Sequence, residues 1–251
     1  MLDHQHREWL ATVAQGTGKI IALTGAGISA ESGIPTFRGE EGYWTAGSAV
    51  HHPTDMATQR MFRAHPEYVW PWYLYRRGIC RAAEPNDGHK SLARLDEAFG
   101  DRFLLVTQNV DGLHLRAGSP AERTYQIHGN IDFMRCTAPC SDALHPIPSG
   151  LEDWPKERVI DDDVWSVLTC PQCHGRTRPH VLWFDECYDE ALYRFESSMN
   201  AAHEASLLLV IGTSGATNLP NHMVSIVART GGLLIDINPA PNPFGQIAGR
   251  L

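Results

Sequence analysis

Four of the six cysteines in this chain of 251 residues form two close pairs. Three residues separate Cys136 from Cys140, and two separate Cys170 from Cys173. Thiolates with this spacing can close a tetrahedral zinc site, and four protein ligands leave the metal no open position for chemistry. We therefore expect one structural zinc ion bound by these four side chains.

This metal site has alternatives in the sequence. The first pair is more widely spaced than is common in zinc ribbons, so His145 or His174 could supply a ligand instead. Without a metal, the four cysteines would be free thiols or a redox pair. Cys80 and Cys187 lie outside both pairs, and we expect them to be buried as small apolar residues. So few cysteines indicate a reducing compartment rather than a disulfide-stabilised secreted protein.

Residues 24–33 have the composition of a phosphate-binding loop. They follow a short apolar run and include Gly25 and Gly27, which allow a backbone to approach an anion closely. N–H groups at the start of a helix also attract phosphate. The same glycines occur in tight turns that serve packing alone. The acidic ribose ligand of ordinary dehydrogenases is not evident, because Glu40 and Glu41 lie in a predicted loop.

Short apolar runs rich in branched residues predict buried strands. These runs are residues 19–24, 103–107, 207–212 and 233–238. Helical patterns occupy residues 87–99, with Asp87 as the N-cap candidate, and residues 189–205. Strands that alternate with helices predict a parallel sheet covered on both faces, with ligands beyond the carboxyl ends of the strands.

Composition narrows the classes of partner. The chain has 21 basic and 29 acidic residues, which gives a net charge of -8 at pH 7. No run of Lys or Arg offers the basic face that a nucleic-acid partner needs. No segment approaches the roughly 20 apolar residues that span a membrane, and residues 1–15 lack the apolar stretch of a secretory signal. We expect a cytoplasmic protein without nucleic-acid or membrane partners, in its simplest form a monomer.

Four motifs stand in the order and approximate spacing of the sirtuin family. They are GAGISAESGIPTFRG at 25–39, TQNVDGLH at 107–114, HG at 128–129 and GTS at 212–214. The sequence resembles sirtuins over nearly its whole length. The resemblance implies that NAD is a co-substrate: the bond to nicotinamide is cleaved, the acyl oxygen of a modified protein lysine captures the ribose, and O-acyl-ADP-ribose and free lysine result.

The resemblance also implies a role for each motif residue. His128 is the candidate general base toward a ribose hydroxyl, because the unperturbed pKa of histidine lies near neutrality. Asn109 and Asp111 are catalytic candidates that can hold a carboxamide and the ribose, with Gln108 beside them, and Phe37 covers the emptied nicotinamide pocket. In the alternative interpretation these residues are turn formers, a structural histidine and a core phenylalanine. The expected NAD contacts are Gly25, Ala26, Gly27, Ser29, Phe37, Arg38, Gln108, Asn109, Val110, Asp111, Gly212, Thr213, Ser214 and Asn238.

Tyr73 and Arg76 are three residues apart on a predicted helix and therefore share a face. A phenol and a guanidinium directed at one point suit a carboxylate. The pattern resembles the sirtuin subclass that removes succinyl, malonyl and glutaryl groups, and Thr36, where many deacetylases carry Asp, favours the same subclass. Deacetylation stays compatible as a lesser activity. The alternative is an amphipathic surface helix with solvated arginines.

Residues 180–186 resemble the family segment that pairs with the substrate peptide, which makes Val181, Trp183 and Phe184 substrate-binding candidates. The sequence departs from the family at Asp185, where Gly is usual, and in the loop 215–218. A carboxylate at Asp185 could repel an acidic acyl group. Sirtuins normally continue beyond the last strand with a loop and a helix that flank the adenine, so we expect a more open adenine side and weaker NAD binding, or an incomplete sequence.

The resemblance implies an α/β fold: a Rossmann-like parallel sheet with helices on both faces plus a smaller zinc-binding lobe. The expected NAD-binding domain comprises residues 1–38, 85–130 and 181–251, and the helical insertion 39–84 and the zinc-binding insertion 131–180 form the small domain. The predicted function is NAD-dependent removal of acyl groups from protein lysines. Two alternatives are an ADP-ribosyltransferase or NAD hydrolase, and a non-catalytic module that senses NAD.

Overall fold

A computed structural model describes residues 4–36, 53–138, 140–156, 158–247 and 249–250. Its larger sheet has six strands in the order β3-β2-β1-β7-β8-β9, and every neighbouring pair is parallel. The strands are β1 (Lys19–Thr24), β2 (Phe103–Thr107), β3 (Thr124–Gln126), β7 (Ala205–Ile211), β8 (Leu233–Ile237) and β9 (Gly249–Arg250). The predicted first and second strands have the observed bounds, and the other two differ by one or two residues at their ends.

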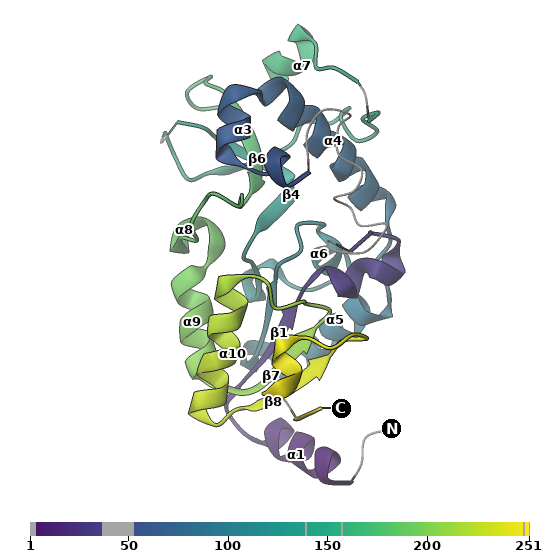
Figure 1. The fold of residues 1–251 in the computed structure, drawn as a ribbon, viewed down its shortest axis with the longest axis vertical. Helices are drawn as coiled ribbons and strands as arrows, with labels where there is room; N and C mark the ends of the chain where they lie inside the picture. The colour runs from purple at the N-terminus through teal and green to yellow at the C-terminus, as the bar shows by residue number, and fades with distance from the viewer. Residues whose placement is uncertain (1–3, 37–52, 139, 157, 248, 251) are drawn as a thin grey trace.

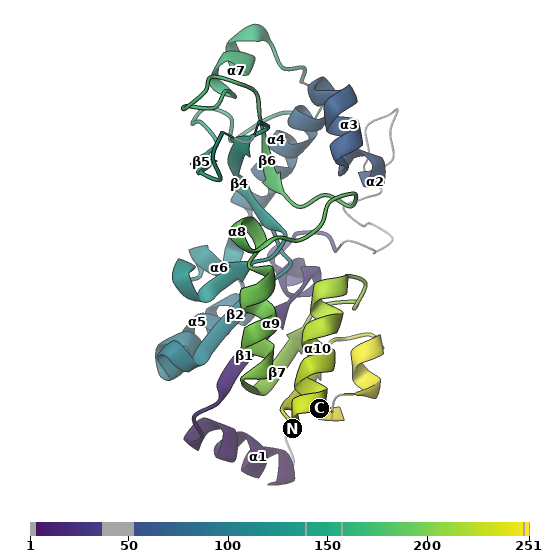
Figure 2. The same ribbon diagram turned by 90° about the vertical axis from the view of Figure 1, so that its left-hand side faces the viewer.

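Helices cover both faces of this sheet (Figures 1 and 2). Ile21 and Leu23 of β1 belong to a buried cluster with side chains of α9 (Phe195–His203) and α10 (Asn218–Thr230). Ile20 and Ala22 belong to a second cluster with Leu92 of α5 (Asp87–Phe99) and with partly buried residues of α1 (His4–Gln15). Successive side chains of a strand point to opposite faces, so β1 is buried from both sides, as the continuous apolar run predicted.

Two of the predicted helices differ in detail. The N-cap of α5 is Asn86 rather than Asp87, because the Asn86 side chain accepts a hydrogen bond from the Gly88 N–H at 2.9 Å. The helical pattern at 189–205 is divided into α8 (Glu190–Tyr193) and α9. Arg194 interrupts it with a left-handed backbone conformation at φ 55°.

A second sheet lies in the upper part of Figures 1 and 2. It is antiparallel in the order β5-β4-β6, formed by β4 (Gly129–Cys136), β5 (Leu144–Pro146) and β6 (Thr177–Val181). Residues 130–180 are rich in proline and have the composition of a loop. That loop-like interpretation is wrong, because the segment contains most of β4, all of β5, most of β6 and the helix α7. The helices of this region are α2 (Pro53–Met56), α3 (Gln59–Ala64), α4 (Pro66–Ala82) and α7 (Asp162–Val167).

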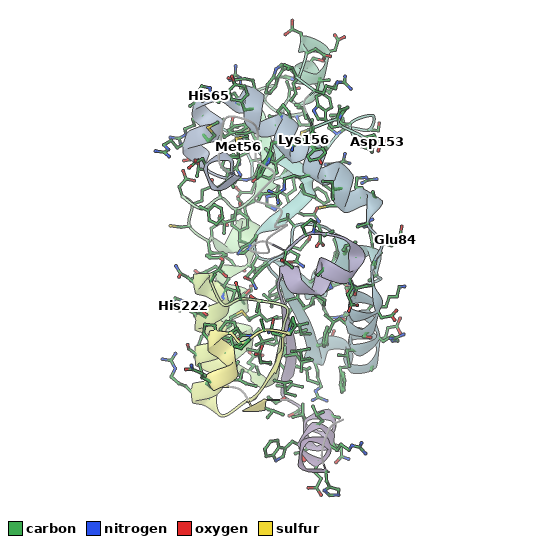
Figure 3. The ribbon with its side chains drawn as sticks, turned by 45° about the vertical axis from the view of Figure 1, so that its right-hand side comes forward. Met56, His65, Glu84, Asp153, Lys156 and His222 are labelled. Atoms are coloured by element: carbon green, nitrogen blue, oxygen red, sulfur yellow. The ribbon has the colours of Figure 1, made fainter. Side chains whose placement is uncertain are left out.

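The second sheet and α4 share a core rich in aromatic residues. Trp70 of α4 is fully buried, and its indole N–H donates a hydrogen bond to the Thr177 carbonyl of β6 at 3.1 Å. Figure 3 shows Met56 and His65 in this upper part and His222 on α10 below. Short elements complete the described fold: α6 (Leu113–Arg116) and the 3-10 turns Ala26–Ser32, Gly100–Arg102, Ala121–Arg123 and Pro243–Gln246.

Two features of the sequence can be compared with the described residues directly. Cys80 is buried as expected, but Cys187 is exposed, so the expectation of burial was wrong for the second cysteine. In the part of the chain that the structure describes, the helices are all too short or too polar to cross a bilayer.

Candidate functional site

The glycine loop after β1 packs directly against the loop after β7. The Gly25 N–H donates to the Ile211 carbonyl at 3.0 Å, and the Gly27 N–H donates to the Gly212 carbonyl at 2.8 Å. A Cβ atom on Gly27 would lie 2.7 Å from the Gly212 Cα, closer than side chains tolerate. The glycines thus let two backbones meet at the carboxyl ends of adjacent strands. The segment that follows Gly25 is a 3-10 helix rather than an α-helix.

A buried hydrogen-bond cluster joins this loop to the segment after β2. The Ser29 hydroxyl donates to the Asp111 carboxylate at 2.7 Å, and the Asn109 amide donates to the Ser29 oxygen and to the Gly25 carbonyl, each at 3.1 Å. The His89 Nε2 lies 3.3 Å from the same hydroxyl. Ser29 is wholly buried, and Asn109 and Asp111 are nearly so. Three residues predicted to bind NAD therefore form one rigid polar group.

Gln108 links the same segment to the loop after β7. Its side-chain N–H donates to the Thr213 hydroxyl at 2.9 Å, and its side-chain oxygen accepts from the Thr217 hydroxyl at 2.8 Å. Both ends of the amide are therefore fixed, which orients Gln108 beside the carboxyl ends of β1 and β2.

His128 has a defined tautomer. Its Nδ1 lies 3.0 Å from the backbone carbonyl of Gln108, which can only accept, so Nδ1 carries the proton. Nε2 consequently presents a lone pair, and the Tyr188 hydroxyl, 2.8 Å away, donates to it. Burial lowers the pKa of His128 to about 4, against the opposing effect of the Gln108 carbonyl. The ring is therefore a neutral base at physiological pH.

Tyr73 and Arg76 are buried on the same side of α4, with exposed fractions of 2% and 8%. The Tyr73 oxygen accepts a hydrogen bond from the Trp183 indole N–H at 2.9 Å. The Arg76 guanidinium carbon lies 4.3 Å from the ring centroid of Trp72 and 5.9 Å from that of Tyr73. Arg77 is also buried, so the alternative of a surface helix with solvated arginines does not hold at these two positions.

The predicted peptide-pairing segment connects β6 to α3 and to the loop of His128. The Leu182 N–H donates to the His128 carbonyl at 2.9 Å, and the Phe184 N–H donates to the Ala57 carbonyl at 3.0 Å. Phe184 is 56% exposed, whereas Val181 and Trp183 are buried. Of the three predicted substrate contacts, Phe184 is therefore the one that a peptide on the surface can touch directly.

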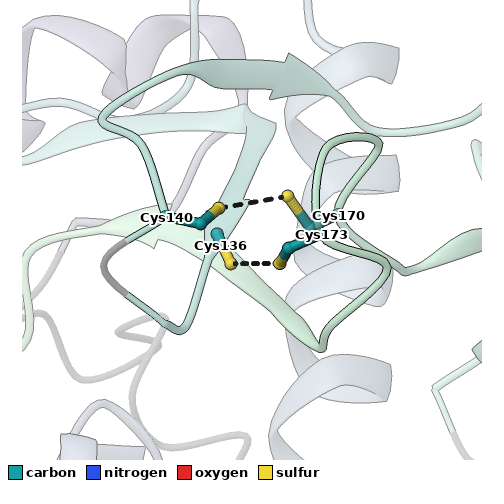
Figure 4. Close-up of side chains that lie close together, drawn as sticks. All are labelled: Cys136, Cys140, Cys170 and Cys173. Atoms are coloured by element: carbon teal, nitrogen blue, oxygen red, sulfur yellow. Dashed lines mark hydrogen bonds between the residues drawn. The ribbon is translucent and has the colours of Figure 1, made fainter.

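The four predicted zinc ligands meet at one point (Figure 4). The sulfur atoms of Cys136 and Cys173 are 3.5 Å apart, those of Cys140 and Cys170 are 3.6 Å apart, and all four lie within 4.8 Å of one another. Zinc–sulfur bonds of about 2.3 Å in a tetrahedron place sulfur atoms about 3.8 Å apart. Backbone N–H groups of Cys173 and Gln172 lower the pKa of the Cys170 thiol to about 6, whereas burial raises the pKa of Cys136 and the hydrogen bond with Cys136 raises that of Cys140.

The histidines considered as alternative ligands are not members of this group. Among the described residues, the metal-capable cluster consists of the four cysteines without His145 or His174. His174 instead takes a left-handed conformation at φ 57° and donates its N–H to the Cys170 carbonyl, which closes the turn that brings the second pair together.

The other residues expected to bind NAD have simpler surroundings. Ala26 opens the 3-10 turn after β1, the Val110 carbonyl accepts from the Ile131 N–H at 2.9 Å, and Ser214 is exposed in the loop after Thr213. Phe37 and Arg38 lie outside the described residues. Asn238 follows β8, hydrogen-bonds Asp236, and lines a surface pocket with Asp236, Ile237 and Pro239.

Comparison with known proteins identifies the family. A family model described as the Sir2 family matches residues 25–218, about three quarters of the chain. The chain belongs to the Sir2 family. The match confirms both the resemblance to sirtuins and the expected fold class.

Curated and solved members of the Sir2 family cover nearly all of this chain. A protein of Leptospira interrogans serogroup Icterohaemorrhagiae serovar Lai (strain 56601), named NAD-dependent protein deacylase, is 42% identical over 228 residues, 91% of this chain and 84% of its own. A mutant Sir2 homologue solved with 2′-O-acetyl ADP-ribose has a TM-score of 0.79 and 35% identity, covering 99% of this chain and 90% of its own. A structure described as Sir2 with a p53 peptide and NAD+ has a TM-score of 0.71 and 31% identity, covering 96% and 90%.

Three polar residues of this Sir2-family site were missed in the sequence. His89 lies in the first turn of a helix that the sequence predicts, but its Nε2 contact with Ser29 is visible only in the structure. Tyr188 and Thr217 carry no motif that separates them from surface residues. Their contacts with His128 and Gln108 join residues 60 and 109 apart in the sequence and exist only in the assembled fold.

Proposed function

We propose that this Sir2-family chain is an NAD-dependent protein deacylase that transfers acyl groups from lysine side chains to ADP-ribose and releases nicotinamide. The observation that carries the proposal is the arrangement of His128. A neutral imidazole with its lone pair on Nε2 stands beside the polar group of Ser29, Asn109 and Asp111. The proposal is supported by two structurally similar Sir2 proteins, one solved with 2′-O-acetyl ADP-ribose and one with NAD+.

NAD, when bound, supplies a ribose whose bond to nicotinamide can break in favour of an acyl oxygen. The chain orients this substrate and removes a proton. The Asn109 amide and the Asp111 carboxylate are fixed by Ser29 and can hold the carboxamide and the ribose. His128 accepts a proton from a ribose hydroxyl at Nε2, and Nδ1 keeps its own proton, which it donates in a hydrogen bond to the Gln108 carbonyl. The predicted NAD contacts, including Phe37 and Arg38, are part of this proposal.

The zinc ion has a structural role in the proposal. Cys136, Cys140, Cys170 and Cys173 fit a closed tetrahedral site, so the metal fastens the two loops that carry the pairs and takes no part in acyl transfer. The proposed domain division keeps residues 1–38, 85–130 and 181–251 in the NAD-binding domain. Residues 39–84 and 131–180 form the small domain.

The acyl preference follows from α4. Burial raises the pKa of the Tyr73 phenol to about 12, so this hydroxyl is a neutral donor, and Arg76 brings a positive charge to the same side of the helix. An acidic acyl group such as succinyl or malonyl satisfies both. The acylated peptide lies along Val181, Trp183 and Phe184. Asp185 does not oppose an acidic acyl group, because its carboxylate is hydrogen-bonded to the start of α3.

The test is incubation of the protein with NAD and matched acetyl-, succinyl- and malonyl-lysine peptides, followed by mass spectrometry of peptides and nucleotides. Loss of the acyl group together with O-acyl-ADP-ribose is the expected result. Consumption of NAD with the acyl group retained identifies a hydrolase or an ADP-ribosyltransferase. Binding of NAD without any product identifies an NAD-sensing module. Either of the last two outcomes refutes the deacylase.

A further inference from the structure

The Tyr188 hydroxyl occupies the nitrogen of His128 that the proposed reaction needs. The two groups are 2.8 Å apart, and the ring centroids are 5.8 Å apart. The phenol must be the donor in this contact, because Nδ1 of His128 already donates to the Gln108 carbonyl and Nε2 therefore has a lone pair. To act as a general base, Nε2 of His128 must give up its hydrogen bond with Tyr188 and accept one from the substrate hydroxyl instead.

Tyr188 is held in place from several directions. Its ring stacks on Phe195 of α9 with the centroids 6.1 Å apart. The next residue, Asp189, is the N-cap of α8 and accepts from the Leu192 N–H at 2.7 Å. The phenol is therefore held in a fixed position within the site.

The chemistry of the phenol suits this position. Burial raises the pKa of Tyr188 to about 12, so the hydroxyl keeps its proton at every pH at which the enzyme works. A donor to Nε2 stabilises the neutral imidazole and not the imidazolium, and it also excludes the other tautomer. Among the described residues, Tyr188 is the titratable side chain that contacts the His128 ring. The pKa of His128 is lowered by burial, with no contribution from a charged side chain.

We propose that Tyr188 is the positioning residue of His128: its hydroxyl holds the ring as the Nδ1–H tautomer with Nε2 directed into the site, and a substrate hydroxyl takes its place at Nε2. The proposal rests on the role of His128 in the proposed function. In the exchange one O–H···N hydrogen bond breaks and another forms. The proton that later moves to Nε2 comes from the substrate hydroxyl, and the phenol retains its own.

The exchange makes a specific prediction for Tyr188→Phe. The profile of kcat/KM against pH reports the free enzyme, in which the Tyr188 bond exists, whereas the profile of kcat reports the substrate complex, in which it has been replaced. Loss of one neutral hydrogen bond should move the acid limb of kcat/KM upward by about 0.7 pH unit. The acid limb of kcat should stay where it is. Tyr193→Phe, which removes a buried hydroxyl at 193 instead, should move neither limb.

A second readout does not depend on activity. Nitrogen NMR of histidine-labelled protein without substrate should give the Nδ1–H tautomer for His128 in the parent, and Tyr188→Phe should raise the pKa of His128 while the Gln108 carbonyl keeps the tautomer. An unchanged pKa in the variant would overturn the proposal even if deacylation is real. A drop of kcat by 100-fold or more at every pH would overturn it too, because the phenol would then handle the proton itself. If the NMR changes occur in a protein that removes no acyl group, the positioning role stands and the deacylase fails.

Discussion

The indole N–H of Trp183 donates a hydrogen bond to the Tyr73 hydroxyl at 2.9 Å. This contact joins the predicted peptide segment to the helix that carries the predicted acyl-recognition pair. Because the indole occupies a lone pair of the phenol oxygen, the phenol proton remains free to be donated. Tyr73 keeps that proton at neutral pH, since burial raises its pKa to about 12. The side of α4 that faces Trp183 therefore presents a donor and, from Arg76, a positive charge.

The first prediction concerns Arg76→Met. Loss of a charge-assisted hydrogen bond to a carboxylate should lower kcat/KM for a succinyl-lysine peptide by about 10- to 100-fold. Activity on the matched acetyl peptide should change by less than about threefold, because an acetyl group has no carboxylate for Arg76 to bind. Steady-state kinetics on both peptides make the measurement. Arg81→Met on the same helix is the control, since its side chain is 46% exposed. Equal losses on the two peptides would remove the carboxylate argument.

The second prediction concerns Asp185, whose carboxylate accepts from the N–H groups of Gln59 at 2.7 Å and Arg60 at 3.1 Å. With Thr58 bound to the next N–H, these bonds cap α3. Asp185→Ala should lower the free energy of unfolding by about 1 kcal/mol and raise KM for peptides.

The ratio of succinyl to acetyl activity should stay constant in Asp185→Ala. A denaturant titration and the two peptide assays test this, with the exposed Asp153→Ala as control. A variant that gains succinyl activity alone would mean that the carboxylate repels the acyl group.

The third prediction is that the purified protein contains one zinc ion per chain. Cys170→Ser should lose the metal and lower the melting temperature by about 10 °C or more, because binding free energy at a structural zinc site is folding free energy. Cys187→Ser should keep both the zinc and the stability, since this cysteine is exposed and outside the cluster. Atomic absorption and thermal melts provide the readouts. A folded protein free of metal would disprove the assignment.

The fourth prediction concerns pH and stability. His114 and His180 are 2% and 3% exposed, and burial lowers the pKa of each from 6.5 to about 3. Below about pH 6.5 the unfolded chain takes up protons that the folded chain refuses, so the free energy of unfolding should fall as the pH drops from 6.5 toward 3.

Urea titrations at pH 7.5, 5.5 and 4.5 measure this slope. His180→Gln should make the free energy of unfolding less dependent on pH, even if the substitution changes the stability at pH 7.5. His222→Gln, an exposed position on α10, should leave the slope as it is (Figure 3). A parent protein equally stable at the three pH values would contradict the argument.

The sequence predicts those parts of the fold in which a local pattern and its tertiary surroundings agree. Three elements have the predicted bounds: the strands Lys19–Thr24 and Phe103–Thr107 and the helix Asp87–Phe99. In the two strands the apolar residues are continuous, and in the helix they recur with the helical period. The four cysteines could be grouped because metal ligands restrict residue type as well as spacing. The strands β5 and β6 were missed because they are short, and the longer β4 was missed because its burial does not alternate regularly and its pairing with β6 is interrupted by a register shift.

The site is predictable where a residue acts through its own chemistry and hidden where it acts through a neighbour. His128 carries a motif, whereas Tyr188 becomes significant only when the fold brings its hydroxyl to the His128 ring. Asp185 was a suspected obstacle to acidic substrates, and its hydrogen bonds to the start of α3 depend on a contact between residues 126 apart in sequence. Such pairings follow from the assembled fold and not from local pattern.

The backbone contact between Gly27 and Gly212 has a consequence for synthesis of the chain. The two residues belong to opposite ends of the sequence, and the Gly27 N–H finds its acceptor on Gly212. A nascent chain that has not yet emerged as far as Gly212 therefore lacks the partner for its first glycine loop, however completely the N-terminal strand has been made. Assembly of the nucleotide loop is a late event on the ribosome.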